Sequence, residues 1–325
     1  MRRTFQLLPL LLVASLTACN SNGAYQEDVL SCFDTYVTVK TKENVIRMQA
    51  RTCEIIKEID AISDAYKKRE VTSVYDLNQT NDKLEVSFYL YDLLSKAVSY
   101  QEIAPNFNLM VGSLTNKWKE SLEKEEVLSK TVILEELTKI NNSSVILEKE
   151  NDKYYAQRVG TGLIDVGAIA KGYALDRCQN YLHQYSDKNH DYLINAGNSS
   201  VLVGKKITAK VKDLSKDTFF DIEESFISTS GISEQKTIID GVAYSHIINP
   251  KTGSAVIGSA GSLYDTVMVI DDNGDGHGAL GDVLSTSLMM STLDEIKEKE
   301  KELGFEVIVI KDDKVKYKSE SLELR

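Results

Sequence analysis

The sequence predicts an α+β domain in which early helices pack on a largely antiparallel sheet. Three observations support this fold class. Apolar residues recur at helical spacing in the early and middle parts of the chain, and short β-rich runs dominate the late part. The chain also has no internal repeat and no Pro-rich linker that would divide the main body.

Four segments carry apolar residues three or four positions apart, which is the spacing of one helix face. We expect each of them to bury that face against the rest of the domain. The last segment turns strongly charged near its end. The four segments are residues 46–56, 90–97, 170–182 and 282–303.

Six short runs are rich in β-branched and other apolar residues, as strands are. All six follow the third helical segment, which places the sheet late in the sequence. The predicted strands are Tyr192–Ala196, Ile207–Val211, Ser225–Ser230, Tyr244–Ile248, Thr266–Ile270 and Phe305–Ile310.

The composition of the 325 residues is that of an ordinary globular protein, with 42% hydrophobic and 27% charged residues. The formal net charge of −11 argues against general binding to nucleic acid, because that binding needs a basic surface. No CxxC, HExxH or G-x-S-x-G motif occurs, so the metal and nucleophile sites built on those motifs are excluded.

The N-terminus reads as a cleaved secretory signal. Arg2 and Arg3 precede an apolar run, Leu7–Leu16, that is too short to span a bilayer. The small residues just before Cys19 resemble the bacterial lipoprotein box, which implies a diacylglyceryl anchor on Cys19. A plain signal peptide with an incidental cysteine is the alternative.

This interpretation divides the chain into three parts. We expect a signal peptide at 1–18, a lipidated cysteine and polar tether at 19–27, and the folded domain at 28–325. The protein would then sit on the extracytoplasmic face of a bacterial membrane, held there by its lipid. The remaining cysteines, Cys32 and Cys53 with Cys178, are odd in number, so we expect buried thiols, with a Cys32–Cys53 disulfide left open.

Two segments carry groups suited to an anion or to proton transfer. In Asp165–Asp176 an extended run ends at Gly167 and a helix follows, so free backbone N–H groups and Lys171 are available to a phosphate or carboxylate. In His246–Gly253 the histidine lies near a strand end, just before an Asn-Pro turn. A tight turn with a surface lysine, and a structural histidine, are the competing interpretations.

Hydroxyl groups mark two further segments. Ser228–Gly231 reads as a hydroxyl-rich turn at a strand end. In Gly281–Ser287, Asp282 and Thr286 are four residues apart and would share one helix face, which suits a hard cation such as Mg²⁺. The alternative for Asp282 is a helix N-cap.

A calcium loop competes for the same region. Asp271, Asn273, Asp275 and Gly276 match positions 1, 3, 5 and 6 of such a loop, and Asp282 falls at position 12. However, an Asp replaces the usual Glu at the last position, and a strand precedes the loop. A solvated β-to-α loop is the other interpretation.

Each segment is ambiguous alone, but together and in this order they resemble one family. From about Cys32 to about Thr292 the chain resembles the FAD:protein FMN transferases of the ApbE family, which implies an ApbE-like, T-fold-related domain. The matching stretches are Phe33–Thr35, Tyr66, Ser73–Asn78, Phe107–Gly112, Leu114, Trp118, Asp165–Asp176, Asn195–Gly197, Thr229–Gly231, His246–Gly253 and Asp282–Ser287.

The resemblance implies a reaction and its partners. Enzymes of this family bind FAD and Mg²⁺, cleave the pyrophosphate, release AMP and attach FMN by a phosphoester to a Ser or Thr. The implied acceptor is an extracytoplasmic redox flavoprotein with a D-x-x-[ST]-[GST]-[AT] sequence. Asp282–Ser287 of this chain fits that pattern loosely, but self-flavinylation is not expected because these residues match metal ligands.

The resemblance also assigns site residues. The Mg²⁺ ligands would be the main-chain carbonyl of Ala168, the Asp282 carboxylate and the Thr286 hydroxyl, with Ser285 beside them. His246 would assist deprotonation of the acceptor hydroxyl. The remaining matches are flavin-nucleotide contacts or pocket residues, namely Phe33, Tyr66, Asn106, Phe107 and Asn108 on one predicted strand, Asp165, Lys171 and Thr229.

The chain departs from the family pattern in one segment. Pro105, Asn108, Met110 and Ser113 replace the usual Gly, Asp, Thr and Pro, which bears on flavin affinity. Two other functions stay open. One is a metal-dependent FAD pyrophosphatase that yields FMN and AMP, and the other is a non-enzymatic FAD-binding lipoprotein.

Overall fold

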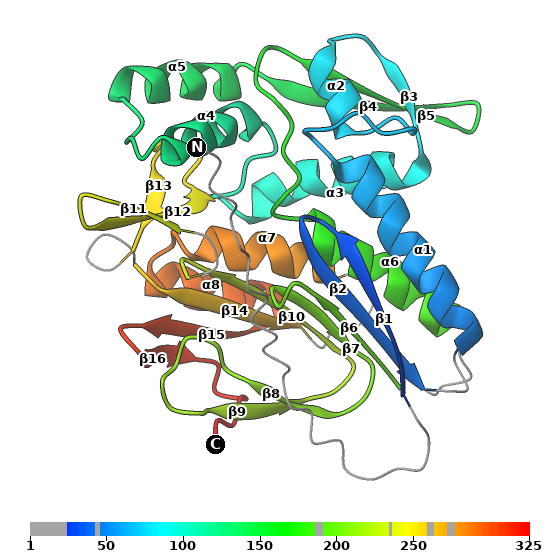
Figure 1. Ribbon diagram of the computed structural model, residues 1–325, viewed down its shortest axis with the longest axis vertical. Coiled ribbons are helices and arrows are strands. Elements are labelled where there is room, and N and C mark those ends of the chain that lie inside the picture. Colours follow the sequence, from blue (N-terminus) through cyan, green and yellow to red (C-terminus); the bar gives the residue numbers. More distant parts are fainter. Residues whose placement is uncertain (1–24, 43–45, 186–190, 234–235, 259–262, 272–276) are drawn as a thin grey trace, which may run out of the picture.

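The structure, a computed structural model, is built around one eight-stranded sheet in which every neighbouring pair is antiparallel (Figure 1). This confirms the predicted α+β class. The described residues are 25–42, 46–185, 191–233, 236–258, 263–271 and 277–325. Across the sheet the order is β1 (Tyr25–Cys32), β2 (Thr35–Lys42), β6 (Tyr192–Ala196), β7 (Ser200–Val203), β10 (Ser225–Gly231), β14 (Thr266–Asp271), β15 (Glu306–Lys311) and β16 (Lys314–Lys318).

Smaller sheets and the helices surround this sheet. Three small sheets are formed by β3 (Leu84–Val86), β5 (Lys153–Val159) and β4 (Ser144–Glu150), by β11 (Lys236–Ile239), β12 (Val242–Ile248) and β13 (Ala255–Ile257), and by β8 (Ile207–Lys210) with β9 (Phe219–Ile222). The helices are α1 (Ile46–Ser63), α2 (Val74–Gln79), α3 (Phe88–Ile103), α4 (Gly112–Glu123), α5 (Lys130–Asn141), α6 (Ala170–Tyr185), α7 (Gly278–Leu288) and α8 (Leu293–Leu303).

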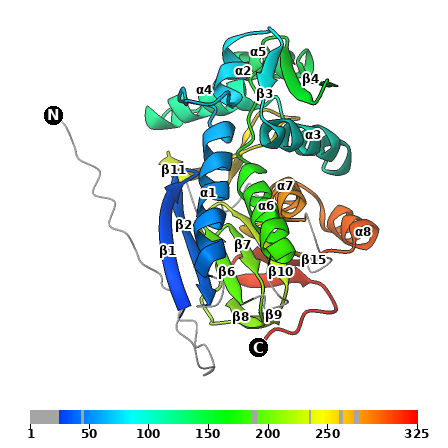
Figure 2. The same cartoon turned by 90° about the vertical axis from the view of Figure 1, so that its right-hand side faces the viewer.

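The main sheet is covered on both faces, because its central strands bury alternate residues on each side. On β14, Val267 and Val269 belong to the large core that contains α1, α3, α6 and α7. Met268 and Ile270 face a second core with Phe220 of β9. Figure 2 shows α1, α6 and α7 on the helical side of the sheet, with β8 and β9 below.

Two sequence predictions about the order of elements are corrected here. The early part of the chain is not only helical, since β1 and β2 form one edge of the main sheet. Most β1 residues are exposed, so no apolar run marks the strand. The predicted helix at 282–303 is two helices, because Thr292 and Glu295 form a capping box that starts α8.

Two local predictions are also wrong. Ser228–Gly231 is the end of β10 and not a turn. Asn106–Asn108 lies in turns and irregular chain after α3, and only Val111 of this region forms a bridge, with Leu163. The Asn106 amide donates to the Ser287 hydroxyl and the Phe107 amide to the Ala104 main-chain oxygen, so neither amide is available to a neighbouring strand.

The three cysteines of the described chain, Cys32, Cys53 and Cys178, are buried and free, as expected. Cys19 and the signal segment 1–18 lie outside the described residues. In the part of the chain that the structure describes, no helix combines the length and the apolar character needed to cross a membrane.

Candidate active site

The site forms where one end of the main sheet meets the first turn of α6. Antiparallel pairing places Ser200, at the start of β7, opposite Ser228 on β10. Helix α7 packs against this end of β10 and against α6. Strand pairing and the packing of α7 on β10 thus bring together Ser200 of β7 and Asp282 of α7, which are 82 positions apart in the sequence.

Asp282 on α7 is the centre of this arrangement. Its carboxylate is 7% exposed and accepts hydrogen bonds from three donors. The Ser200 hydroxyl lies 2.7 Å from Oδ1, the Ser228 hydroxyl 2.8 Å from Oδ1, and the Gly172 backbone nitrogen 2.7 Å from Oδ2. A helix begins at Gly278, so Asp282 is inside α7 and not its N-cap.

Burial raises the pKa of Asp282, and the positive charge of Lys171 is the largest opposing influence. Lys171 lies in the first turn of α6, as the sequence predicted. The hydroxyl and amide donors also lower the pKa. The charge of Lys171 therefore acts on the Asp282 carboxylate and favours its ionised form.

Three hydroxyl groups lie next to this carboxylate. The Ser230 hydroxyl is 3.0 Å from both the Ser285 and the Thr286 hydroxyl, and Ser285 also donates to the main-chain oxygen of Asp282. Ala168 lies in the turn just before α6, four residues before Gly172. The predicted ligands Asp282, Ser285 and Thr286 thus share the α7 face toward β10.

The donor set fits a hard cation. It offers a carboxylate, hydroxyl groups and the Ala168 carbonyl, which are all oxygen ligands. Within the described ranges, no group of three or more His, Cys, Asp or Glu side chains could hold a metal. A single carboxylate suits Mg²⁺ bound together with substrate phosphates, since Mg²⁺ keeps several water or phosphate ligands.

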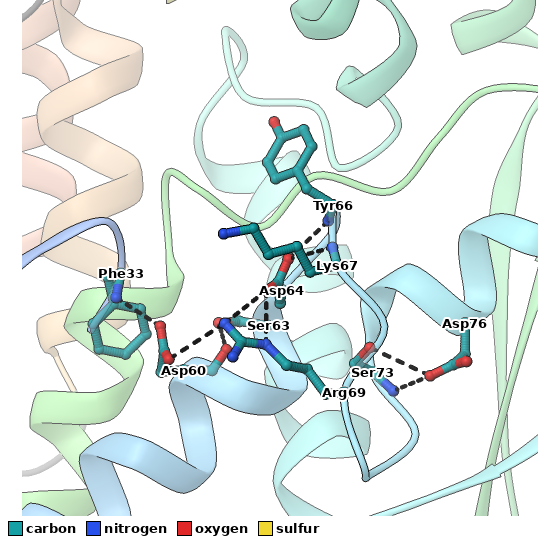
Figure 3. A network of polar contacts seen from close by, with 9 residues as sticks. All are labelled: Phe33, Asp60, Ser63, Asp64, Tyr66, Lys67, Arg69, Ser73 and Asp76. Atoms are coloured by element: carbon teal, nitrogen blue, oxygen red, sulfur yellow. Dashed lines mark hydrogen bonds and ion pairs between the residues drawn. The ribbon is translucent and has the colours of Figure 1, made fainter. Parts of the chain in front are cut away.

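A second group of predicted residues lies around Tyr66 (Figure 3). The Tyr66 and Lys67 amides donate to Asp64 at 2.8 Å and 2.9 Å, and Arg69 pairs with Asp64 at 2.7 Å. Partial burial and the charges of Asp165, Asp34 and Asp64 raise the pKa of Tyr66. The charge of Asp165 thus reaches Tyr66, and the flavin contacts of both residues stay predictions.

Phe33 is held in the same network. It has a left-handed backbone (φ 54°), and its amide donates to Asp60 of α1 at 2.6 Å. Arg69 links Asp60 to Asp64, which Figure 3 shows between the Phe33 ring and Tyr66. The carboxylate of Asp165 accepts the Gly167 amide at 2.8 Å and so shapes the turn before α6.

Asn106 and Phe107 are placed differently from the other predicted pocket residues. The Asn106 amide group donates to the Ser287 main-chain oxygen and to the Ser291 hydroxyl, both at 3.2 Å. Phe107 is buried in the large core. Asn108 accepts the Met110 amide at 2.8 Å. The contacts that the structure gives these three residues are structural, and their flavin contacts stay predictions.

The sequence singled out Thr229, but its neighbours carry the contacts to α7. Ser228 and Ser230 point to Asp282, Ser285 and Thr286. Alternation along a strand places the Thr229 side chain on the other face. The sequence analysis missed four site residues, Ser200, Ser228, Ser230 and Gly172. The alternation of Ser228 and Ser230 along a strand indicates that their hydroxyls share one face, and could have identified these two.

His246 lies on the arm formed by β11, β12 and β13, near the end of β12 as predicted, and it is exposed. The Asn-Pro turn after it is closed by the Gly253 amide, which donates to Asn249 at 2.8 Å. The arm is fixed to α4 by the Trp118 indole, which donates to the Gly253 main-chain oxygen at 2.7 Å. The Trp118 ring also stacks on Tyr244 of β12.

Two cavities lie away from this site. One of about 530 Å³ is lined by the C-terminal residues 321–325 and strand β9, and another of about 220 Å³ lies between α3, α7 and α8.

Of the calcium-loop residues, Asn273, Asp275 and Gly276 lie outside the described residues. Asp271 is paired with His277 at 2.8 Å, and Asp282 is engaged as described above.

The family can now be stated from comparison with known proteins. The ApbE family model matches residues 33–309. The chain belongs to the ApbE family. An FAD:protein FMN transferase of Klebsiella pneumoniae is 27% identical over 63% of this chain and 66% of its own length. One of Haemophilus influenzae is 23% identical over 70% of this chain and 71% of its own length. These relatives confirm the predicted family and its class, the transferases.

Solved ApbE structures share the fold. The ApbE protein of Thermotoga maritima superposes with a TM-score of 0.75 at 23% identity, covering 92% of this chain and 96% of that protein. The flavin transferase ApbE of Vibrio cholerae gives a TM-score of 0.71 at 21% identity, covering 92% and 98%. The ApbE-like domain predicted from the sequence is thus confirmed as a fold.

Proposed function

We propose that this chain is an Mg²⁺-dependent FAD:protein FMN transferase. It would cleave FAD, attach FMN by a phosphoester to a Ser or Thr of a flavoprotein, and release AMP. The observation that carries the proposal is the buried Asp282 carboxylate beside Lys171, with the hydroxyls of Ser285 and Thr286 on the same helix face. Family membership and the names of its relatives support the same reaction.

The residues divide the work of this reaction. Asp282, Thr286 and the Ala168 carbonyl would hold Mg²⁺, with Ser285 beside them. When bound, the ion would neutralise charge that develops on the pyrophosphate oxygens. Lys171 would contact the same pyrophosphate from the first turn of α6. Its fixed charge needs no reorganisation during the reaction, which favours the transition state.

The flavin nucleotide would lie between the Asp165–Tyr66 neighbourhood and the Phe33 turn. The Asp60–Arg69–Asp64 network links the Phe33 turn to the chain around Tyr66, and would hold these two segments in place for the ligand. The other predicted pocket residues are Asn106, Phe107, Asn108 and Thr229. Asn106 would act indirectly by supporting α7, and Phe107 by packing in the core.

His246 would take the proton of the acceptor hydroxyl. A hydroxyl is a weak nucleophile and needs such a base. The hydroxyl oxygen then bonds to the FMN phosphorus, the bond from that phosphorus to the bridging oxygen breaks, and AMP leaves with that oxygen. Because His246 is exposed on an arm, a partner protein can reach it.

We further propose that the protein acts outside the cytoplasm. The sequence of 1–18 and Cys19 supports a lipoprotein signal and a lipid anchor, with 19–27 as the tether. The acceptor would be an extracytoplasmic redox flavoprotein that carries the D-x-x-[ST]-[GST]-[AT] sequence. Metabolic labelling with a palmitate analogue tests the anchor, since Cys19→Ala would abolish the label and leave the protein in the soluble fraction.

One incubation separates the three candidate functions. The purified protein is mixed with FAD and Mg²⁺, with and without an acceptor domain that carries Asp-x-x-Thr-Ser-Ala, and AMP and covalent flavin fluorescence are followed. A fluorescent acceptor that forms only with Mg²⁺ supports the transferase. AMP and free FMN without labelling would establish the pyrophosphatase, and bound uncleaved FAD would establish a flavin-binding lipoprotein.

A further inference from the structure

Helices α6 and α7 exchange hydrogen bonds through two equivalent Gly–Asp pairs. Gly172 and Asp176 are four residues apart on α6, as Gly278 and Asp282 are on α7. The Gly172 amide donates to Asp282 at 2.7 Å, and the Gly278 amide donates to Asp176 at 2.6 Å. Each aspartate thus accepts the amide of the glycine on the other helix. We call these four residues the Gly–Asp clamp.

The clamp requires the two helices to touch at their backbones. A Cβ atom on Gly172 would lie 2.0 Å from the Gly278 main-chain oxygen, and one on Gly278 would lie 2.6 Å from the Gly172 main-chain oxygen. Neither position has room for a side chain. The clamp therefore defines the distance between the helices as well as their rotation.

Asp176 has no contact with solvent and both of its oxygens are engaged. It is 0% exposed, and its second oxygen accepts the Ala279 amide at 3.1 Å. These two amides belong to the first turn of α7, whose N–H groups have no partner within the helix. A carboxylate at this end also interacts favourably with the helix dipole. Asp176 therefore holds α7 at its start, one turn before Asp282.

We propose that Asp176 is a positioning residue for the Mg²⁺ site at Asp282. It fixes the rotation and axial position of α7, so that Asp282, Ser285 and Thr286 face β10 and the Ala168 turn. Because Asp176 is fully buried, it cannot touch the substrate and acts only through α7. This inference rests on the proposed function, in which Asp282 is the carboxylate ligand.

The test compares Mg²⁺ binding in three variants by isothermal titration calorimetry with MgCl₂ in the presence of FAD. Asp176→Asn keeps one acceptor oxygen for α7 and loses the second, whereas Asp176→Ser leaves only a hydroxyl on a shorter side chain. Asp92→Asn is the matched control, since Asp92 accepts the Tyr173 hydroxyl of α6 and is not bonded to α7. Circular dichroism melting establishes that each variant is folded.

We expect the two Asp176 variants to bind Mg²⁺ about 10–100-fold more weakly than wild type, as is typical when a residue that orients a metal ligand is changed. FAD affinity without Mg²⁺ should change less than 2-fold, roughly the scatter expected where no ligand contact is lost. The Asp92→Asn control should bind Mg²⁺ like wild type. Equal Mg²⁺ affinity in wild type and folded Asp176 variants would overturn the inference and leave the proposed function standing.

The wild-type chain provides a second measurement that needs no variant. If the clamp couples Asp282 to the start of α7, Mg²⁺ should slow hydrogen exchange of the peptide that contains Gly278 and Ala279. Unchanged exchange in a chain that binds Mg²⁺ would contradict the coupling. Absence of Mg²⁺ binding in wild type itself would overturn the metal site and the positioning role together.

Discussion

The Trp118 indole on α4 donates a hydrogen bond to the main-chain oxygen of Gly253 at 2.7 Å, across 135 positions of sequence. The same ring stacks on Tyr244, with the centroids 6.0 Å apart. A Cβ atom at Gly253 would lie 2.4 Å from Ile133 of α5, so the turn is pressed against the helices. The arm that carries His246 is therefore attached to the helical part of the molecule at this turn and through Tyr244.

Trp118→Phe should loosen this attachment while keeping an aromatic ring against Tyr244. The buried Gly253 oxygen loses its donor, which costs about 1–3 kcal/mol of unfolding free energy. We expect kcat for FMN transfer to fall with little change in KM for FAD. Tyr317→Phe is the control, because it removes a partly buried hydroxyl bond to Glu300 that is not part of the arm. A parallel loss of kcat in both variants would mean a general stability effect.

His246→Ala should slow transfer without weakening FAD binding. A general base contributes typically 10²–10⁴-fold to rate, so a loss of about that size is expected. Stability should change by less than about 0.5 kcal/mol because His246 is exposed. Single-turnover kinetics with FAD in excess and fluorescence titration of FAD separate the two effects. Lys251→Ala, which changes an exposed residue on the same arm, is the control and should behave like wild type. If His246→Ala reduced the affinity for FAD as strongly as the rate, His246 would be a pocket residue and not a base.

Asp282→Ala should abolish Mg²⁺-dependent turnover and also lower the melting temperature. The Ser200, Ser228 and Gly172 donors would lose their acceptor, and each unpaired buried group costs about 1–3 kcal/mol. Asp282→Asn keeps an acceptor oxygen and should melt closer to wild type while binding Mg²⁺ poorly. Residual Mg²⁺-dependent release of AMP at the wild-type rate in either folded variant would remove Asp282 from the metal site.

The late strands were predicted more closely than the elements of the N-terminal half. Tyr192–Ala196 was predicted with the bounds that β6 has, and its residues alternate between buried and partly buried positions, as expected of a strand. β1 escaped prediction because a mostly exposed edge strand carries no apolar pattern. α4 also escaped prediction. It begins with Gly112 and Ser113, two weak helix formers, and its four buried residues are spread over three turns.

The candidate site was also predicted only where a local sequence pattern marks it. Asp282 and Thr286 were found because a four-residue spacing on a helix is visible in sequence. Ser200 was missed because only the register of β7 against β10 places it opposite Ser228 and under α7. Gly172 was missed because its role depends on the close approach of two helices, which no local pattern reveals.

Asp176 should give the protein a pH-dependent stability that Asp176→Asn lacks. Burial raises the pKa of Asp176 to about 7, and the Ala279 and Gly278 amides, with Lys96 and Arg177, oppose the rise. In the unfolded chain an Asp has a pKa of about 3.9. Between about pH 4 and pH 7 the folded chain therefore binds more protons than the unfolded chain, so stability falls as the pH rises through this window.

The measurement is urea unfolding of wild type and Asp176→Asn at several pH values from 4 to 8. The difference in unfolding free energy, wild type minus variant, should decrease with pH by at most about 1.4 kcal/mol per unit and level off above about pH 7. His277 is paired with Asp271, which raises its pKa, so its titration also lowers stability as the pH rises. Repeating the comparison in a His277→Gln background removes that contribution. A difference that stays flat, or that grows with pH, would contradict this prediction. It would mean that the Asp176 carboxylate is already ionised in the folded protein near pH 4, so that a full negative charge lies at the start of α7 throughout this range.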